Sequence, residues 1–468
     1  MSGWNFEHSY AKLPHIFYRK QIPEPAPHPA MVIFNEGLAK DLGLNPDELK
    51  EDAALFTGTA LPARANPISQ AYGGYQFGHF SMLGDGRAVL LGEQVTDAGR
   101  FDVQLKGSGP TPFSRGGDGY AALLPMLREY IISEAMHALG IPTTRSLAVA
   151  LTGRDVYRQT VLQGAVLTRV AASHIRVGTF NFIARYGSVD DLAALADYSI
   201  WRHFPHLEGQ QDKYLLFLRE VCKLQAALIA KWQLSGFIHG VMNTDNMAIS
   251  GETIDYGPCA FMDAYDPGTV FSSIDTAGRY AYKNQPTIGA WNLCRFAESL
   301  LPLLDKNHET AADLANEEIA LYWKHHQQNL SSGLRAKLGL VDEGPDDTRM
   351  ITELFDQMQA TRLDYTNTFR SLALGHQIAG LEGWQEQWLA RLNSQPGGAV
   401  NAFVAMKAHN PAVIPRNHRV EEALDAAGQG NFDVMHNLLA ALSKPFEDFE
   451  EYSQAPAAAC GYKTFCGT

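Results

Sequence analysis

The sequence predicts an α+β protein of two lobes, a small one built on an antiparallel sheet and a larger helical one. Short apolar segments separated by turn residues lie between residues 88 and 170, whereas apolar residues at helical spacing dominate from residue 189 onward. At 468 residues the chain exceeds the size of one hydrophobic core, so several structural units are expected. We expect an N-terminal extension over 1–83, the small lobe over 84–170, the large lobe over 171–340 and a helical C-terminal extension over 341–468.

The composition is that of an ordinary globular protein. Hydrophobic residues make up 46% of the chain and charged residues 19%, and the net charge is −13 without a long basic run. Nucleic acid is therefore not expected as a partner, because phosphate contacts need clustered Lys and Arg. No signal peptide and no apolar run of about 18 residues is visible, so we expect no membrane partner and a cytoplasmic location. Five cysteines without C-x-x-C spacing indicate neither a zinc site nor a secreted disulfide framework.

The first 80 residues are predicted to be largely irregular. Prolines at alternate positions over 23–29 indicate an extended segment that cannot be helical. Short helices are expected over 34–42 and 46–55. The glycine-rich run YGGYQFG, residues 72–78, is interpreted as a packed loop.

Strands are predicted over 88–95 and 101–106, directly after the sequence Gly84-Asp85-Gly86-Arg87. A lone G-x-G is common in turns, but its place before two strands also suits a loop that covers phosphates. Lys106 ends the second strand.

The segment 120–139 is predicted to be a helix that stops at Gly140. Glu129 lies in its middle and is the expected partner of Lys106, the alternative being a solvated carboxylate. The preceding loop, 107–119, carries Asp118 among several glycines. This loop is either simply flexible or a contact for phosphate or ribose.

Strands over 146–151 and 165–170 are expected to complete the sheet. Arg169 ends the second of these strands and Arg176 follows after a short loop. The two arginines either bind an anion through guanidinium geometry or are surface charges. Helices are then predicted over 192–204, 212–234, 291–304, 309–338 and 347–374.

The stretch His239–Gly257, HGVMNTDNMAISGETIDYG, concentrates oxygen-bearing side chains. Residues 247–250 and 253–254 are predicted to form a β-hairpin, with Asp245 and Asn246 before it and Asp255 after it. Because a hairpin brings its ends together, these three side chains should converge. Carboxylate and amide oxygens are ligands for Mg²⁺ when phosphates complete its shell. Polar residues that only cap a hairpin are the alternative interpretation.

This stretch resembles the catalytic loop of protein kinases, H-R-D-x-x-x-x-N followed by D-F-G. Aligned on His239, the pattern puts its asparagine at Asn246 and its last aspartate at Asp255. The aspartate that acts as base in kinases falls on Val241, which cannot accept a proton. The nearest carboxylate is Asp245. The sequence therefore predicts a protein-kinase-like fold with rearranged chemistry.

The strings HGVMNTDN, DYGPC, GDGR and YGGYQFG together resemble the selenoprotein O family, pseudokinases that act as protein adenylyltransferases. The resemblance covers about residues 72–303 and the C-terminus. It implies a kinase-like fold that holds ATP in reversed orientation. AMP from ATP, or UMP from UTP, would be transferred to Ser, Thr or Tyr hydroxyls of protein substrates, with pyrophosphate leaving.

The resemblance also implies a role for each matching residue. Asp245 would be the proton acceptor, and Asn246 and Asp255 would hold Mg²⁺ or Mn²⁺. Glu129 would form the supporting ion pair with Lys106. The nucleotide would be bound by Gly84, Gly86, Arg87, Lys106, Asp118, Gly119, Arg169, Arg176 and Asp255.

A cysteine near the end of the chain is part of the same resemblance. The family carries selenocysteine, or cysteine in most bacterial members, three positions from the end, where Cys466 stands here. In some members a disulfide from this residue locks the activation segment. The corresponding segment 266–275 has no cysteine, so Cys460 and Cys259 are the remaining candidate partners.

Two rival hypotheses remain at this stage. A conventional protein kinase would transfer the γ-phosphoryl group of ATP, which Val241 disfavours. A catalytically inactive nucleotide-binding scaffold would need no carboxylate beside Asn246.

Overall fold

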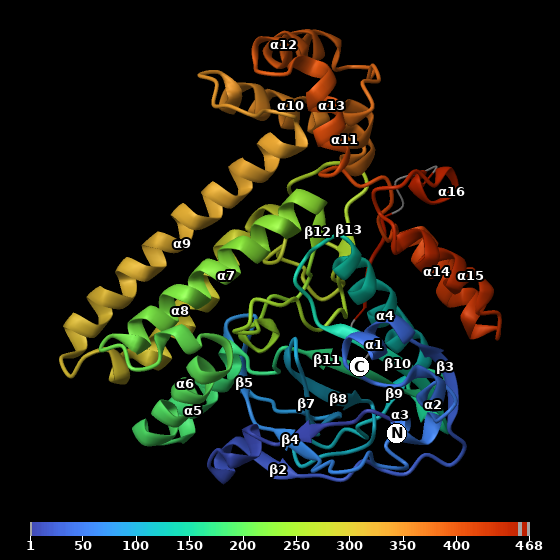
Figure 1. Cartoon of the computed structure of the whole chain (residues 1–468), viewed down its shortest axis with the longest axis vertical. Helices are drawn as coiled ribbons and strands as arrows, with labels where there is room; N and C mark the ends of the chain where they lie inside the picture. Colours follow the sequence, from blue (N-terminus) through green and yellow to red (C-terminus); the bar gives the residue numbers. More distant parts are fainter. Residues whose placement is uncertain (1, 457–460, 466–468) are drawn as a thin grey trace.

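The computed structural model describes residues 2–456 and 461–465, and it is an α+β protein organised around one antiparallel sheet (Figure 1). The strands of this sheet are β1 (Phe6–Glu7), β2 (Tyr18–Lys20), β3 (Ala30–Phe34), β4 (Ile68–Gln70), β7 (Ala88–Thr96), β8 (Gly99–Lys106), β9 (Ala121–Ala122), β10 (Arg145–Tyr157) and β11 (Val161–Ala171). Their order is β2-β4-β7-β8-β11-β10-β3, with β1 beside β7 and β9 beside β11. The four strands predicted for this sheet, over 88–95, 101–106, 146–151 and 165–170, are therefore confirmed, and each is longer than expected.

The N-terminal residues belong to this sheet, so the prediction of a largely irregular start is wrong. β3 pairs with β10, and β1 and β4 pair with β7. The expected helices are α1 (Glu36–Asp41), α2 (Pro46–Leu49) and α3 (Ala53–Thr57), the second prediction being split in two. Ala148 and Ala150 of β10 pack in the cluster of α1 to α3. Val149, which points to the other face of the sheet, packs in the cluster of α4 (Leu123–Ala138). Helices α1 to α3 therefore cover one face of the sheet and α4 covers the opposite face.

The run YGGYQFG forms a β-hairpin, not the packed loop that was predicted. Its strands are β5 (Gly73–Gln76) and β6 (His79–Met82). Phe77 and Gly78 form the turn between them, with φ of +49° and +89°. Positive φ at both central positions is the type I′ geometry that suits the twist of a two-residue hairpin.

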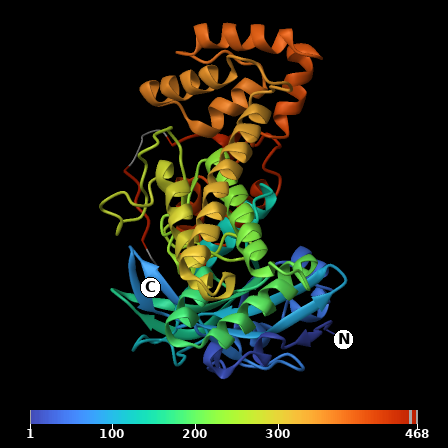
Figure 2. The same cartoon turned by 90° about the vertical axis from the view of Figure 1, so that its left-hand side faces the viewer.

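Helices make up most of the chain after β11. They are α5 (Val177–Tyr186), α6 (Val189–His203), α7 (Lys213–Ser235), α8 (Gln285–Leu304), α9 (His308–Lys337), α10 (Asp347–Thr361), α11 (Tyr365–Ala373), α12 (Glu382–Ser394), α13 (Gly398–Lys407), α14 (Asn417–Gly428), α15 (Asp433–Leu442) and α16 (Glu450–Ser453). The helix predicted over 347–374 is interrupted, because Arg362 adopts φ +54° between α10 and α11. Figure 2 shows the sheet at one end of the molecule and α10 to α13 at the other, with α9 running between them.

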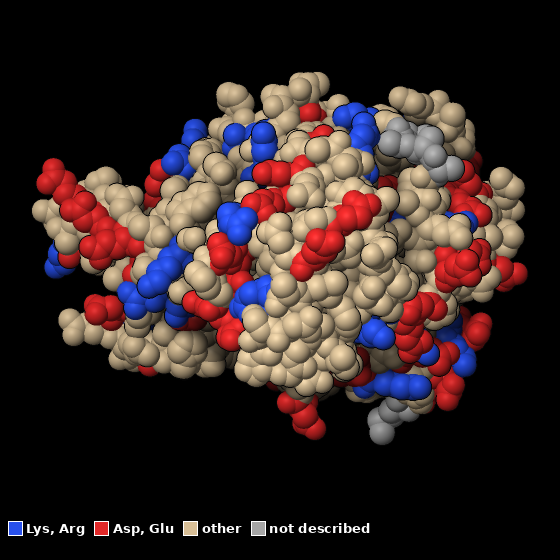
Figure 3. Space-filling model, turned by 90° about the horizontal axis from the view of Figure 1, so that it is seen from above, with Lys and Arg blue, Asp and Glu red and all other residues tan. Residues whose placement is uncertain are grey.

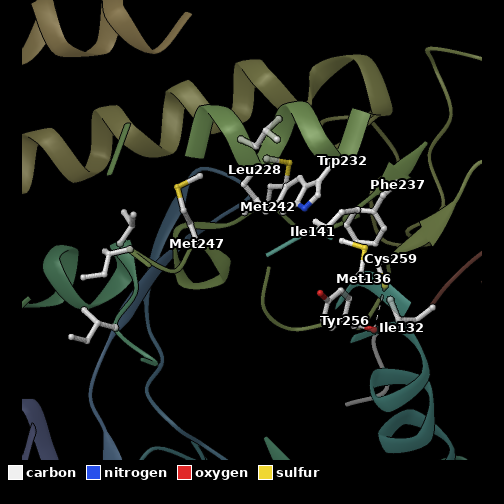
Figure 4. Packing of buried hydrophobic residues seen from close by; sticks show 14 of the residues in the cluster. Ile132, Met136, Ile141, Leu228, Trp232, Phe237, Met242, Met247, Tyr256 and Cys259 are labelled. Atoms are coloured by element: carbon white, nitrogen blue, oxygen red, sulfur yellow. Dashed lines mark hydrogen bonds between the residues drawn. The ribbon is translucent and has the colours of Figure 1, made fainter. Parts of the chain in front are cut away.

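A buried apolar cluster supports the segment after α7. In Figure 4, Leu228 and Trp232 of α7 and Met136 of α4 lie with Phe237 and Tyr256 in one group. Trp232 Nε1 also donates to Thr253 Oγ1 at 2.9 Å. The segment that carries the predicted catalytic residues therefore rests on a rigid base of two helices. Two short strands, β12 (Phe237–Ile238) and β13 (Ala260–Phe261), pair at its ends.

The surface carries both signs of charge. On the face seen in Figure 3, acidic and basic side chains are interspersed. None of the helices in the described part of the chain is both long and apolar enough to span a membrane.

Candidate functional site

One cavity of about 730 Å³ gathers the side chains that the sequence singles out. It is bounded by the sheet, by α4 and by the segment 241–258. The predicted residues that line it are Gly84, Gly86, Arg87, Lys106, Asp118, Gly119, Glu129, Arg169, Arg176, Asp245, Asn246 and Asp255. The structure thus brings all of them together, while their roles stay predictions.

The sheet presents two of the predicted nucleotide-binding cations, Lys106 and Arg169, on one face. Gln104 and Lys106 are two residues apart on β8, and Arg169 of β11 lies opposite Gln104. Residues at this spacing, and residues paired across antiparallel strands, share a face. Lys106 Nζ donates to Glu129 Oε2 of α4 at 2.6 Å, so the contact expected between them is present. Arg169 Nη2 donates to Gln104 Oε1 at 2.6 Å.

Asp255 is the point at which the cations meet. Its Oδ1 accepts from Lys106 Nζ at 2.9 Å and from Arg169 Nη1 at 2.6 Å, and its Oδ2 accepts from Arg176 Nη1 at 3.2 Å. Burial raises the pKa of Asp255, but attraction to Lys106, Arg169 and Arg176 outweighs burial and holds that pKa well below its usual value. The carboxylate is therefore ionised at neutral pH. Its backbone φ is +64°, which is uncommon outside glycine.

The β-hairpin predicted over 247–254 is wrong. The two halves pair with other segments: Val177 N donates to Met247 O at 2.9 Å, and Ile249 N donates to Ile175 O at 3.1 Å. Thr253 pairs instead with Thr143, in a parallel bridge. Asp245 and Asp255 converge all the same, because the loop is fastened at both ends to the segments before α5 and β10.

Asp245 is buried, with 7% of its surface exposed, in a single 3₁₀ turn, Thr244–Asn246. Its backbone oxygen accepts from Arg176 Nη1 at 3.0 Å. Its Oδ1 has no hydrogen-bond partner among the described residues. Burial raises the pKa of Asp245 to about 6. A buried carboxylate that lacks a hydrogen-bond donor on one oxygen keeps part of its charge uncompensated, and such a group readily accepts a proton.

Asn246 and Val241 also lie at the cavity wall. Asn246 Nδ2 donates to Val241 O at 3.0 Å. Since this bond uses the amide nitrogen, the amide oxygen is the atom left for a ligand. Val241 stands where the kinase pattern has its base, and it offers no side-chain acceptor.

Two loops form the opposite wall. Gly84, Gly86 and Arg87 precede β7, and the loop 107–119 lies against them, with Thr111 Oγ1 donating to Asp85 O at 2.6 Å. The loop is therefore tied down at this point. Asp118 at its end forms an ion pair of 2.7 Å with Arg158.

Sequence reasoning missed several residues of the site. Gly74 packs so closely that a Cβ there would lie 2.0 Å from Asp245 Oδ1. The ring of Tyr72 lies under the Arg176 guanidinium, 4.3 Å from ring centroid to Cζ. Asp85 is buried, and burial raises its pKa to about 6. The repeated glycine and tyrosine of the run 72–78 were the available signal, but the partners that explain them are distant in sequence.

The C-terminal tail contributes to the cavity as well. Tyr462, Lys463, Thr464 and Phe465 line it, and Thr464 Oγ1 donates to Pro258 O at 2.7 Å. Cys259 is a free, buried thiol, and burial raises its pKa to about 12. The predicted redox residues Cys460 and Cys466 lie outside the described residues.

Comparison with known proteins shows the family of the chain. A family model described as protein adenylyltransferase SelO matches residues 1–443. The chain is 59% identical over 481 residues to a protein nucleotidyltransferase YdiU from Brevibacillus brevis, covering 100% of this chain and 98% of that protein. A protein of the same name from Geobacillus kaustophilus is 57% identical over 482 residues, with 100% of both chains covered. One from Bacillus thuringiensis is 56% identical, with 100% and 99% covered. The chain therefore belongs to the SelO family of protein adenylyltransferases and is a nucleotidyltransferase.

Proposed function

We propose that this protein transfers AMP from ATP to Ser, Thr or Tyr hydroxyls of other proteins in a metal-dependent reaction that releases pyrophosphate. UTP is an alternative donor, which would transfer UMP. The family match supports nucleotidyl transfer. The arrangement of sheet, α4 and the segment 241–258 around one cavity supports a two-lobed, kinase-like organisation of the site.

One observation carries this proposal. The position of the kinase base is occupied by Val241, and Asp245 is the nearby residue that can act as base instead. Val241 has no proton acceptor in its side chain, whereas Asp245 has a buried carboxylate oxygen without a partner among the described residues. Asp245 would take the proton of the acceptor hydroxyl. The hydroxyl oxygen then bonds to the α-phosphorus, the bond from that phosphorus to the bridging oxygen breaks, and pyrophosphate carries away the electron pair.

The residues present fit a divalent metal. Asp255 is an ionised carboxylate, and Asn246 has its amide oxygen to spare, which are the hard oxygen ligands that Mg²⁺ or Mn²⁺ takes. Among the described residues, no group of three or more His, Cys, Asp and Glu side chains could hold a metal alone. The nucleotide phosphates would therefore complete the shell. When bound, the metal would neutralise phosphate charge.

Lys106, Arg169 and Arg176 would act on the phosphates directly. All three donate to Asp255. A triphosphate brings several negative charges to the same place, so these donors can be shared with it. Preorganised cations of this kind stabilise charge that develops on the leaving pyrophosphate.

Labelled ATP tests the proposal. A protein extract or a purified acceptor is incubated with the enzyme and ATP labelled at either the α- or the γ-phosphate. Label in protein from the α position alone is expected. Label from the γ position alone would establish a conventional kinase instead, and label from neither would leave a nucleotide-binding scaffold.

We expect Lys106→Met to reduce transfer by about 10²-fold while the protein stays folded, because one positioned phosphate donor is lost. Methionine keeps the length of the stem that packs between β8 and α4. Incorporation of α-label and the melting temperature would be measured beside Lys20→Met, an exposed position on β2. A variant that melts early but keeps full specific activity would show a structural lysine.

We expect Gly74→Ala to slow transfer by about 10²-fold, because the new Cβ would press on the Asp245 carboxylate and displace it. The matched control is Gly383→Ala on α12, where a Cβ meets no atom within 4 Å. Rates with saturating nucleotide would be compared. Equal rates for both variants would mean that the hairpin yields and the carboxylate does not move.

A further inference from the structure

Phe77, at the tip of the β5–β6 hairpin, has a conformation that the nucleotide site does not explain. It is a bulky residue with φ +49° in a turn where Asn or Gly is favoured. Backbone strain of this kind, about 1–3 kcal/mol, persists chiefly at functional sites. The side chain is 36% exposed, and its ring packs edge-on against Tyr280 with centroids 5.2 Å apart. An aromatic ring is therefore held at the surface against the preference of the turn.

Phe77 does not itself line the cavity, but it adjoins two residues that do, Gln76 in the sequence and Asn243 in space, and we call this edge of the cavity the rim. Asn243, which lines the cavity, accepts through Oδ1 from Phe77 N at 3.3 Å and from the hydroxyl of Tyr280. Tyr75 N donates to Thr244 Oγ1 at 2.9 Å, one residue before Asp245. The hairpin, which lies beside α5 (Figure 1), is therefore hydrogen-bonded to the turn that holds Asp245 and to the residue before that turn.

Aromatic rings and guanidinium groups continue outward from this rim. Tyr75 packs edge-on against Phe80 and Trp291, with centroids 5.4 and 5.7 Å apart. Arg185 lies over Phe80 and Arg279 over Trp291, each with Cζ 4.9 Å from the ring centroid. We call this group the rim surface: Tyr75, Phe77, Phe80, Trp291, Arg185 and Arg279.

The charge of the rim surface is positive. Arg185 and Arg279 form no ion pair with any described residue, whereas the neighbouring Arg295 pairs with Glu298. The buried carboxylate of Asp275, on the same segment as Arg279, accepts instead from the backbone N–H groups of Arg279 and Tyr280 at 2.9 and 2.7 Å. The rim surface thus carries two guanidinium groups without an ion-pair partner among the described residues, on a chain whose net charge is −13.

We propose that the rim surface binds the acceptor protein and selects segments in which acidic side chains flank the modified hydroxyl. The inference rests on the proposed function, because an acceptor protein bound here would lie beside the turn that holds Asp245. Aromatic residues and arginine are the groups that contribute most to protein interfaces. Guanidinium groups held over rings can still bind carboxylates through their N–H groups. Single-stranded nucleic acid also stacks on such groups, but it needs a long basic groove.

The test uses the full-length protein and two fluorescent peptides. Each has one serine, flanked by glutamate in one peptide and by lysine in the other. Anisotropy measures binding in the presence of an ATP analogue with a methylene bridge between the α- and β-phosphorus, and α-labelled ATP measures transfer. The variants are Phe77→Asn, which retains the favoured turn without the ring, Arg185→Glu, and Arg185→Glu with Arg279→Glu. Arg349→Glu, exposed on α10, is the matched control.

The glutamate peptide is expected to bind and react in preference to the lysine peptide. Reversing both charges should raise its KM by about tenfold, with kcat and nucleotide affinity retained. Arg185 is exposed, so its single variant keeps the test valid if the double variant fails to fold. Equal use of both peptides, or an unchanged KM in the charge-reversal variants, overturns the proposal. An oligonucleotide that binds more tightly than the glutamate peptide overturns it too. Binding of that peptide without transfer to any acceptor would instead overturn the proposed function and leave the docking surface in place.

Discussion

Asp255→Asn is expected to lower AMP transfer by at least about 10³-fold at every metal concentration. The substitution removes the formal charge from the one carboxylate that would hold the metal together with Asn246. It also leaves Lys106, Arg169 and Arg176 around a neutral group, since all three donate to Asp255. Removing one partner of a buried ion cluster costs about 3 kcal/mol or more, so the melting temperature should fall as well.

The measurement is incorporation of α-label across a titration of Mg²⁺ and Mn²⁺, at a temperature where circular dichroism shows the variant folded. Asp97→Asn, exposed in the turn between β7 and β8, is the control and should match the wild type. Transfer near the wild-type rate at ordinary metal concentrations would show that the metal binds elsewhere.

Asp245→Asn is expected to slow transfer by about 10²–10⁴-fold while metal and nucleotide affinity are largely retained. Asparagine has the size of aspartate but does not accept a proton at neutral pH. The backbone oxygen that receives Arg176 is unaffected by the change, so the turn should keep its shape. The loss is incomplete because the cations would still stabilise the leaving pyrophosphate.

Nucleotide affinity by titration and α-label incorporation are measured on the same preparation. A parallel fall of affinity and rate would make Asp245 a metal ligand, in the manner of Asp255. Unchanged incorporation would remove Asp245 from the reaction altogether. The contrast between the two aspartate variants therefore separates base from ligand.

The sequence predicts the parts of this site whose signals are local. Strands β7 and β8 follow from apolar segments bounded by turn residues, and Lys106 and Glu129 follow from their positions in a strand end and a helix centre. Their contact of 2.6 Å needed only those two assignments. The motif around Asn246 and Asp255 was likewise readable, because residue type and spacing carry it.

The errors arise where distant partners decide the structure. Residues 247–250 and 253–254 were predicted to pair with each other across a short turn, but the backbones of Met247 and Thr253 bond to Val177 and Pro142. The run at 72–78 appeared loop-like because of its glycines. Their purpose is close packing, since a Cβ on Gly73 would lie 2.5 Å from the ring of Phe80. The N-terminal strands are short, and their partners in β7 and β10 follow far along the chain. No local pattern announces such pairings.

Helices α14 and α15, near the C-terminus, cover one side of α4, and this packing has a consequence for biosynthesis. Arg128 of α4 donates to Glu421 of α14 across 293 positions of sequence, and α14 and α15 pack on the helix that carries Glu129. Contacts of such separation form late and slowly. A nascent chain can build the sheet early, but α4 keeps an uncovered apolar side until residues 417–442 have left the ribosome. Chains that terminate early would therefore be substrates for chaperones and proteases before they could modify any protein.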